Sequence, residues 1–103
     1  MTLLPSAEIE ALLPSIPAWH MDKSKIIRTF RFASFPSAIS FVSEVAHVAE
    51  ALDHHPDILI QYRSVTLTLT THSVGGLTTL DFQTASAIEA LPSGSPASSP
   101  DPR

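Results

Sequence analysis

The sequence predicts one α+β domain, in which a four-stranded antiparallel sheet is covered on one face by helices. Two observations support this fold class. Four short segments with the residue alternation and composition typical of strands occur as two pairs, each joined by a tight turn. Three segments with helical spacing of apolar residues flank and separate these pairs, which gives the order α-β-β-α-β-β-α. The length of 103 residues, with 44% apolar and 16% charged residues, suits a single globular domain rather than a disordered chain.

The N-terminal part is expected to contain a short helix and the first strand pair. Ser6 is a residue type that caps helices, and Pro14 and Pro17 are expected to stop the helix that it begins. Residues 18–22 and 25–32 are predicted to be strands joined by a turn, because the pattern of both segments favours extended backbone.

The strongest helical pattern spans residues 35–52. Ser34 is the expected N-cap, and Pro36 lies in the first turn, where the N–H that proline lacks is not needed. Pro56 ends the segment. The spacing of three and four residues predicts a core-facing stripe of Phe35, Ala38, Ile39, Val42, Val45, Ala46, Ala49 and Leu52.

The C-terminal part is predicted to hold the second strand pair and the last helix. Residues 57–62 and 64–72 are the predicted strands, and the alternation of the second one places His72 on its polar face. Thr78 and Asp81 have the spacing of a capping box and should begin the last helix. Its core-facing residues are predicted to be Phe82, Ala85, Ile88 and Leu91.

The folded domain is expected to cover residues 1–91. Residues 92–103 (PSGSPASSPDPR) contain four of the nine prolines and no residue that could anchor a core, so they are predicted to be a disordered tail. A domain of this size buries only a modest fraction of its surface, and association into a homo-oligomer is therefore an expected source of stability.

Composition restricts the partners and the compartment. A net charge of −4 argues against binding to nucleic acid or to an anionic membrane through a basic patch. The absence of cysteine excludes disulfides, thiol nucleophiles and cysteine-based metal sites. No apolar run is long enough to span a membrane, and the N-terminus shows no targeting pattern, so a cytoplasmic protein is expected.

The histidines are the notable feature of the composition, with five of them in a chain that has only three glycines. His54 and His55 are adjacent at the predicted end of the long helix, near Glu50 and Asp53, and His72 lies at a predicted strand end. Imidazole titrates near neutrality, so histidines flanked by carboxylates suit proton transfer to and from a bound substrate. The sequence therefore predicts an acid–base site in which Glu50 or Asp53 orients a ring.

Each of these residues also has a simpler structural interpretation. His54 and His55 follow a helix, where a protonated imidazole interacts favourably with the negative end of the helix dipole. His72 is compatible with a solvent-exposed strand residue, and Asp81 is explained by the capping box alone. The remaining histidines, expected to be surface residues, are His20 and His47.

A metal site is an alternative chemical interpretation. Three histidines and Glu50 are suitable ligands for zinc or iron(II). Their spacing does not match a compact arrangement such as two histidines four residues apart on one helix. Acid–base chemistry without a metal is therefore the preferred interpretation.

The same residues form a longer pattern: Glu50-x-x-x-His54-His55-Pro56, followed by Tyr62, His72 and Asp81. Further elements are Trp19, I-x-R-x-F-x-F at 26–32, F-x-x-A-x-x-F at 35–41 and T-H-x-x-x-G-L at 71–77. Together they resemble the pterin-4a-carbinolamine dehydratase family over roughly residues 19–91, with the tail outside the likeness.

This resemblance implies a fold, an assembly and an activity. The fold is a four-stranded antiparallel sheet with helices against one face, in a chain that forms dimers or tetramers. The activity is the dehydration of 4a-hydroxytetrahydropterin to the quinonoid dihydropterin, a step of tetrahydropterin recycling that needs no metal or organic cofactor.

The resemblance also implies residue roles. The catalytic histidines of the family fall on His54, His55 and His72, and its supporting acid falls on Glu50. We expect His54 and His72 to be the acid–base pair and His55 to hold the pterin ring. The predicted substrate-binding residues, those from Thr71 onward partly through backbone groups, are Asp53, His54, His55, Pro56, Thr71, His72, Ser73 and Val74.

Binding proteins on the same fold are the alternative that the resemblance leaves open. Some animal relatives stabilise the dimer of a homeodomain transcription factor, and degenerate bacterial relatives are associated with Rubisco assembly. The degenerate relatives tend to lose the histidine pattern, which this chain keeps, so the dehydratase is the preferred interpretation. A protein partner could coexist with that activity.

Overall fold

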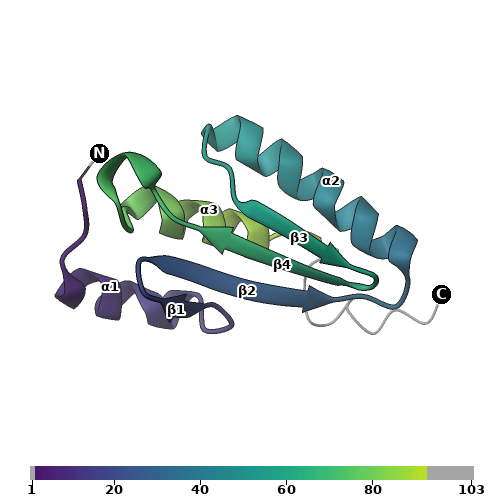
Figure 1. The fold of residues 1–103 in the computed structure, drawn as a ribbon, viewed down its shortest axis with the longest axis horizontal. Helices are drawn as coiled ribbons and strands as arrows, with labels where there is room; N and C mark the ends of the chain where they lie inside the picture. Colours follow the sequence, from purple (N-terminus) through teal and green to yellow (C-terminus); the bar gives the residue numbers. More distant parts are fainter. Residues whose placement is uncertain (1, 93–103) are drawn as a thin grey trace.

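The computed structural model describes residues 2–92, so the predicted tail, apart from Pro92, lies outside the described residues. The predicted order of helices and strands is confirmed (Figure 1). The elements are α1 (Ser6–Leu12), η1 (Leu13–Ser15), β1 (His20–Asp22), β2 (Lys25–Arg31), α2 (Phe35–Leu52), β3 (Asp57–Gln61), β4 (Ser64–Leu69), η2 (His72–Val74) and α3 (Thr79–Glu89), where η denotes a short 3-10 turn.

The four strands form one antiparallel sheet in the order β1-β2-β4-β3. β2 lies beside β4 at the centre, with Ile26 opposite Leu69 and Phe30 opposite Val65. β4 alternates half-buried and buried side chains, as its sequence predicts. β3 forms one edge of the sheet, and all five of its side chains are exposed.

A single apolar core joins the sheet to the helices, and Figure 1 shows α2 and α3 running along the sheet. This arrangement confirms the predicted α+β class. The strands β2 and β4 contribute Ile26, Phe30, Val65, Leu67 and Leu69. The helices contribute Ile9 from α1, Ala38, Phe41 and Val45 from α2, and Phe82, Ala85 and Ile88 from α3.

The long helix α2 begins and ends as predicted, but its buried face differs from the predicted stripe. The prediction that Phe35, Ile39 and Ala46 face the core is wrong, since Phe35 and Ile39 are 46% and 40% exposed and Ala46 is exposed as well. Phe41, which the stripe omits, is fully buried instead. Its ring lies 4.6 Å from that of Phe30 and 5.0 Å from that of Phe32, between centroids, and this contact fixes the rotation of the helix. None of the helices within residues 2–92, α2 included, is long and apolar enough to cross a membrane.

Two local predictions are also corrected. Pro5 occupies the N-cap of α1, and Ser6 is the first helical residue, because Pro5 already holds the extended backbone that a cap position requires. The strand predicted to reach His72 ends at Leu69. Beyond that point Thr71 pairs with Gly76 of its own loop, so the chain turns instead of continuing the strand.

Candidate active site

The first wall of the candidate site is the turn that ends α2. Asp53 adopts left-handed backbone with φ 52°, and its N–H donates to the carbonyls of Ala49 and Glu50. The N–H of His54 also donates to the Ala49 carbonyl, at 3.0 Å. These bonds satisfy carbonyls at the helix end and redirect the chain. His54 and His55 therefore lie at the junction between α2 and β3.

The second wall is the loop between β4 and α3. The N–H of Thr71 donates to the Gly76 carbonyl at 2.9 Å, and the N–H of Gly76 donates to the Thr71 carbonyl at 3.3 Å. Between them, the turn η2 carries His72 and Ser73, and Gly75 has φ 71°, which glycine adopts without strain. His72 thus stands, exposed, on a closed loop and not on the predicted strand.

The two walls border a pocket of about 340 Å³. This volume is within the range of small-molecule sites, roughly 300–1,000 Å³. The structure brings together in its lining Asp53, His54, His55, Thr71, His72 and Ser73, all of which are predicted site residues. Thr70 also lines the pocket and was missed, because the strand pattern marks it only as a polar-face residue. Its hydroxyl donates to the Ser24 carbonyl at 2.7 Å, which ties the pocket to the first hairpin.

Three predicted site residues lie outside that lining, namely Glu50, Pro56 and Val74. Glu50 nevertheless reaches the site through His55, whose Nε2 is 2.5 Å from the Glu50 Oε2. The side chains of this pair are 54% and 78% exposed for His55 and Glu50, respectively. Glu50 therefore contacts the His55 ring from the solvent side of the pocket.

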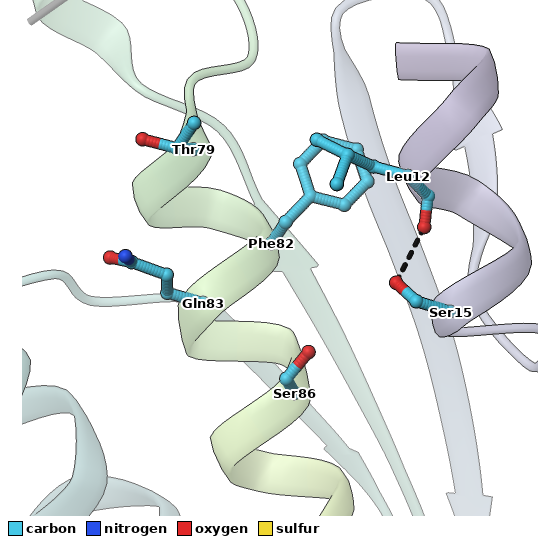
Figure 2. A pocket seen from close by; sticks show the side chains of 6 residues that line it. All are labelled: Leu12, Ser15, Thr79, Phe82, Gln83 and Ser86. Carbon is cyan, nitrogen blue, oxygen red and sulfur yellow. Dashed lines mark hydrogen bonds between the residues drawn. The ribbon is translucent and has the colours of Figure 1, made fainter. Parts of the chain in front are cut away.

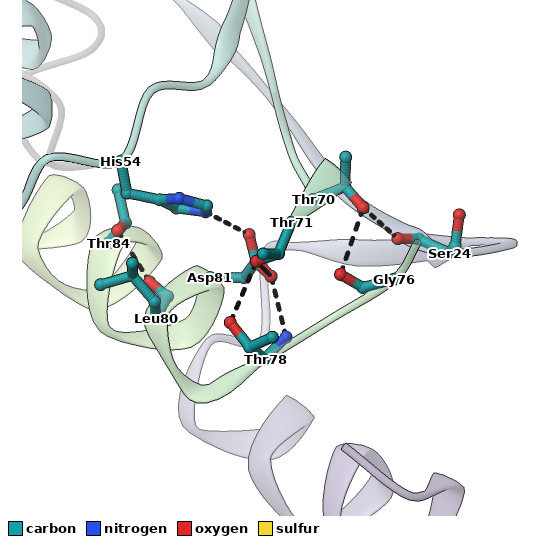
Figure 3. A network of polar contacts seen from close by, with 9 residues as sticks. All are labelled: Ser24, His54, Thr70, Thr71, Gly76, Thr78, Leu80, Asp81 and Thr84. Carbon is teal, nitrogen blue, oxygen red and sulfur yellow. Dashed lines mark hydrogen bonds and ion pairs between the residues drawn. The ribbon is translucent and has the colours of Figure 1, made fainter. Parts of the chain in front are cut away.

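A buried carboxylate lies behind His54 (Figure 3). Asp81 is 0% exposed, and its Oδ1 is 2.6 Å from the Nε2 of His54. Its Oδ2 accepts hydrogen bonds from the Thr71 hydroxyl at 2.8 Å and from the Thr78 N–H at 2.9 Å. The hydroxyl proton of Thr71 is therefore donated to Asp81. In the 3.0 Å contact between the hydroxyls of Thr71 and Thr78, the Thr78 hydroxyl must then be the donor and the Thr71 oxygen the acceptor.

This network fixes the tautomer of the His54 ring. A carboxylate accepts hydrogen bonds, so the Nε2 of His54 must carry a proton, and in the neutral ring Nδ1 then holds the lone pair. The His54 side chain is only 11% exposed, which restricts its rotation. The predicted capping box of Thr78 and Asp81 is confirmed. The contact between Asp81 and His54 joins residues that are 27 positions apart in sequence, so no local sequence pattern predicts it.

The remaining residues of interest lie elsewhere. His20 and His47 are exposed, as expected, and outside the pocket. Tyr62, which belongs to the sequence pattern, sits in the turn at the far end of β3 and is 68% exposed. Within its own chain, Tyr62 is separated from His55 by the whole of β3.

The metal alternative lacks geometric support. Among residues 2–92, no group of three or more His, Asp or Glu side chains is arranged to hold a metal ion. His54 and His55 instead contact two different carboxylates, Asp81 and Glu50.

A second hollow of about 460 Å³ lies between the first helical segment and α3 (Figure 2). Its lining consists of Leu12, Ser15, Thr79, Phe82, Gln83 and Ser86. Figure 2 shows Phe82 directed toward Leu12, and the Ser15 hydroxyl donates to the Leu12 carbonyl at 2.6 Å. These six side chains include no acid, base or histidine, so the groups suited to proton transfer are those of the histidine pocket.

Comparison with known proteins identifies the family. The family model described as Pterin 4 alpha carbinolamine dehydratase matches residues 2–91. A relative from Chloroflexus aurantiacus, provisionally named a pterin-4-alpha-carbinolamine dehydratase, is 52% identical over 91 residues, which cover 88% of this chain and 98% of the relative. A relative from Acidobacterium capsulatum with the same provisional name is 47% identical over 91 residues, which cover 88% and 99% of the two chains.

Solved structures agree with this result. A transcriptional coactivator/pterin dehydratase from Brucella melitensis has a TM-score of 0.84 at 33% identity, over 91% of this chain and 100% of that one. A pterin dehydratase-like protein, described as a RuBisCO assembly factor in the alpha-carboxysome, has a TM-score of 0.62 at 23% identity, over 76% and 93% of the two chains, and shows the shared fold alone. With a family model that matches residues 2–91, the chain belongs to the pterin 4 alpha carbinolamine dehydratase family.

Proposed function

We propose that this chain dehydrates 4a-hydroxytetrahydropterin to the quinonoid dihydropterin by histidine acid–base catalysis, as a step of tetrahydropterin recycling. The observation that supports the proposal best is the contact of His54 with the buried Asp81, at a pocket that His72 also lines. Membership of the family supports a pterin as the substrate.

The reaction needs two proton transfers. The C4a–O bond breaks as an acid protonates the departing hydroxyl, which leaves as water, and a base removes the N5 proton while the N5=C4a double bond forms. His54 suits the role of base, because Asp81 holds its Nε2–H and leaves the Nδ1 lone pair for the N5 proton. His72, on the other wall, suits the role of acid. Each such transfer contributes about 10²–10⁴ in rate.

Backbone groups of η2 are suited to bind the polar edge of the pterin. The N–H and carbonyl of Thr71 are already paired with Gly76, and the N–H of Val74 donates to the Thr71 carbonyl. The N–H groups of His72 and Ser73, two residues that line the pocket, are the proposed donors to the ligand. His55, oriented by Glu50, would flank the pterin ring. Roles in binding for Asp53, Pro56 and Val74 stay predictions.

The proposal includes a cytoplasmic homo-oligomer that requires no metal or organic cofactor. The cleavage of the C4a–O bond requires of the protein only a proton donor and a proton acceptor, and imidazole and carboxylate groups can supply both. A small domain with an exposed apolar edge strand, β3, gains stability by association.

A dehydration assay tests the proposal. The substrate is generated enzymatically, and the absorbance of the quinonoid product is followed against the spontaneous rate. We expect the wild type to accelerate the reaction, and His54→Ala and His72→Ala each to lower kcat by about 10²–10⁴. The control His47→Ala, which alters an exposed histidine of α2, should leave kcat unchanged. A folded wild type without acceleration contradicts the function, and a fully active double variant of His54 and His72 contradicts the mechanism.

A non-catalytic role as a binding or assembly protein is the second candidate. It is favoured by the description of the solved neighbour from Brucella melitensis as a transcriptional coactivator/pterin dehydratase. The histidine pocket, however, has no evident use in such a role. A folded wild-type chain that neither accelerates dehydration nor binds a reduced pterin would support this second candidate.

A further inference from the structure

Thr71 lines the histidine pocket, yet its polar groups are used within the chain. Its N–H donates to the Gly76 carbonyl, and its own carbonyl accepts the N–H groups of Gly76 and Val74. Its hydroxyl donates to the Asp81 Oδ2 at 2.8 Å and accepts the Thr78 hydroxyl at 3.0 Å. Threonine has one N–H and one O–H to donate, and both are taken. Thr71 therefore has no hydrogen-bond donor left for a ligand.

The hydroxyl of Thr71 joins the two walls of the pocket through one buried carboxylate. Figure 3 shows His54 and Thr71 reaching Asp81 from different segments of the chain. The Asp81 Oδ1 accepts the His54 Nε2–H at 2.6 Å, while Oδ2 accepts the Thr71 hydroxyl. Asp81 is 0% exposed and Thr71 only 5%, so both bonds lie in a medium of low dielectric, where they are stronger than in water. The end of α2 and the η2 loop, residues 71–76, are thus tied to the same side chain.

Thr71 is also the residue that precedes His72. Consecutive Cα atoms across a trans peptide are held about 3.8 Å apart, so the placement of Thr71 determines where the backbone of His72 begins. The His72 side chain is exposed, and its position depends on the backbone that carries it. Two hydrogen bonds and one peptide bond therefore connect His54 to His72 through Asp81 and Thr71.

The η2 loop is held at its other end as well. Gly76 pairs with Thr71 and closes the loop. A Cβ atom added at Gly76 would lie 2.6 Å from the Cδ1 of Leu3, so the Leu3 side chain covers this end of the loop. The N–H of Leu4 donates to the Leu77 carbonyl at 2.9 Å. The loop is thus a short closed unit, and Thr71 is the end at which it meets the site.

We propose that Thr71 is a positioning residue, which acts through Asp81 to fix His72 relative to His54. The inference rests on the proposed function, which assigns these two histidines as acid and base. Both must come within hydrogen-bond reach of the same substrate, roughly 2.6–3.2 Å from the atoms that they serve. A misplacement of about 1 Å can cost about 10² in rate. A carboxylate bonded to both walls sets the separation of the two histidines before a substrate binds.

Thr71→Val tests the proposal, because valine has a similar shape and lacks the hydroxyl. We expect kcat to fall by about 10–10², while the Kd for dihydrobiopterin, measured by calorimetry, stays at the wild-type value. Thr68→Val is the matched control: it makes the same change at a half-buried position of β4 outside the pocket and should leave kcat unchanged. An unchanged kcat for Thr71→Val overturns the proposal. Weaker binding of dihydrobiopterin with a normal kcat also overturns it, because that result indicates direct contact with the substrate.

Two further variants keep the test decisive if Thr71→Val does not fold. Thr71→Ser retains a hydroxyl donor and should restore most of the wild-type kcat. Thr71→Cys has a thiol, which is a weak donor, and should give a kcat below that of Thr71→Ser. Equal values of kcat for the serine and cysteine variants would overturn the proposal, since the strength of the bond to Asp81 would then not matter.

A double variant tests whether Thr71 acts through Asp81. Residues that act through one shared partner give effects that do not add. Thr71→Val combined with Asp81→Asn should therefore have a kcat no lower than Asp81→Asn alone. Losses that multiply would show that the two residues act independently, and they would overturn the proposal.

The link between the walls is also tested without substrate, so that its failure can be separated from failure of the proposed function. Backbone nitrogen relaxation at His72 and Ser73 should give order parameters of about 0.85 in the wild type, the value of rigid backbone, and values near 0.6 in Thr71→Val. Thr68→Val should keep the wild-type values. If the wild type does not accelerate dehydration, the proposed function fails while this measurement still decides the link. Unchanged order parameters in Thr71→Val overturn the inference whatever the activity.

Discussion

At the scale of single residues, Asp81 shows how one side chain serves both the fold and the site. Its Oδ2 accepts the N–H of Thr78 and thereby caps α3, while its Oδ1 contacts His54. A fully buried carboxylate is costly unless it is paired and hydrogen-bonded, and here three donors surround it. The same contacts that stabilise the buried carboxylate therefore hold the His54 ring in one orientation.

Asp81→Asn tests the positioning role. The asparagine side chain keeps one acceptor oxygen where Asp81 has two, so His54, the Thr71 hydroxyl and the Thr78 N–H compete for it and the His54 tautomer is no longer fixed. We expect kcat to fall by about 10–10² if part of the acid–base contribution is lost. The nitrogen NMR shifts of the His54 ring should show protonation at Nε2 in the wild type and a mixture in the variant. Thr78→Ala is the control, because it removes a hydroxyl of the cap and leaves the His54 contact intact. Equal losses of kcat in the two variants would contradict the assignment.

At the scale of elements, α2 is bounded by two local signals, and its C-terminal end places the first wall of the site. Ser34 begins the helix with a side-chain cap on the N–H of Ser37, at 3.2 Å. Asp53 ends it in left-handed backbone and directs His54 toward α3. Both ends are properties of the local sequence and agree with the predicted bounds. The face that α2 buries is set by the contacts of Phe41, and the apolar periodicity of the sequence did not predict that Phe41 belongs to this face.

Ser34→Ala should destabilise the protein through this helix alone. Loss of a serine cap costs about 1 kcal/mol of unfolding free energy, and the pocket residues are not touched by the change. Urea denaturation measures the effect. Ser40→Ala alters an exposed serine inside the same helix and serves as the matched control, because alanine has the higher helix propensity there. An equal loss in both variants would show that the cap is not the cause.

At the scale of the whole molecule, a polar cluster joins segments that are far apart in sequence. The Nε1–H of Trp19 donates to the Glu89 Oε2 at 2.8 Å, and Arg28 of β2 donates to the same oxygen. The Arg28 guanidinium also lies 4.0 Å from the centroid of the Phe30 ring. Glu89 is the last residue of α3, so this cluster holds the far end of that helix against the first hairpin.

Glu89→Ala should lower the global stability. The change leaves the Trp19 N–H and the Arg28 guanidinium, which is 11% exposed, without their shared partner, at a cost of about 1–3 kcal/mol. Trp19 is the only tryptophan, so its fluorescence reports both unfolding and the local change. Glu10→Ala, at an exposed position of α1, is the control and should change stability little. Wild-type stability in Glu89→Ala would mean that the cluster contributes nothing.

Much of the fold could be predicted from the sequence, because its signals are local. The strand pairs, the bounds of α2 and the capping box of Thr78 and Asp81 each depend on residues within a few positions of one another. The histidines could also be identified from the sequence as candidate site residues, because few residue types transfer protons near neutrality. Their grouping with Ser73 and Thr71 follows from the tertiary structure, which folds the η2 loop back over the end of α2.

The sequence by itself determined the α+β order of elements, the bounds of α2, the capping box of α3 and the residue types of the candidate site. Only the tertiary structure decided that Asp81 contacts His54, that Phe41 and not Phe35 faces the core, and that Tyr62 stands apart from the pocket of its own chain. The physical reason is the range of the interactions. Caps, turns and periodicity act within one element, whereas side chains on different elements meet only when the sheet and helices pack into a shared core.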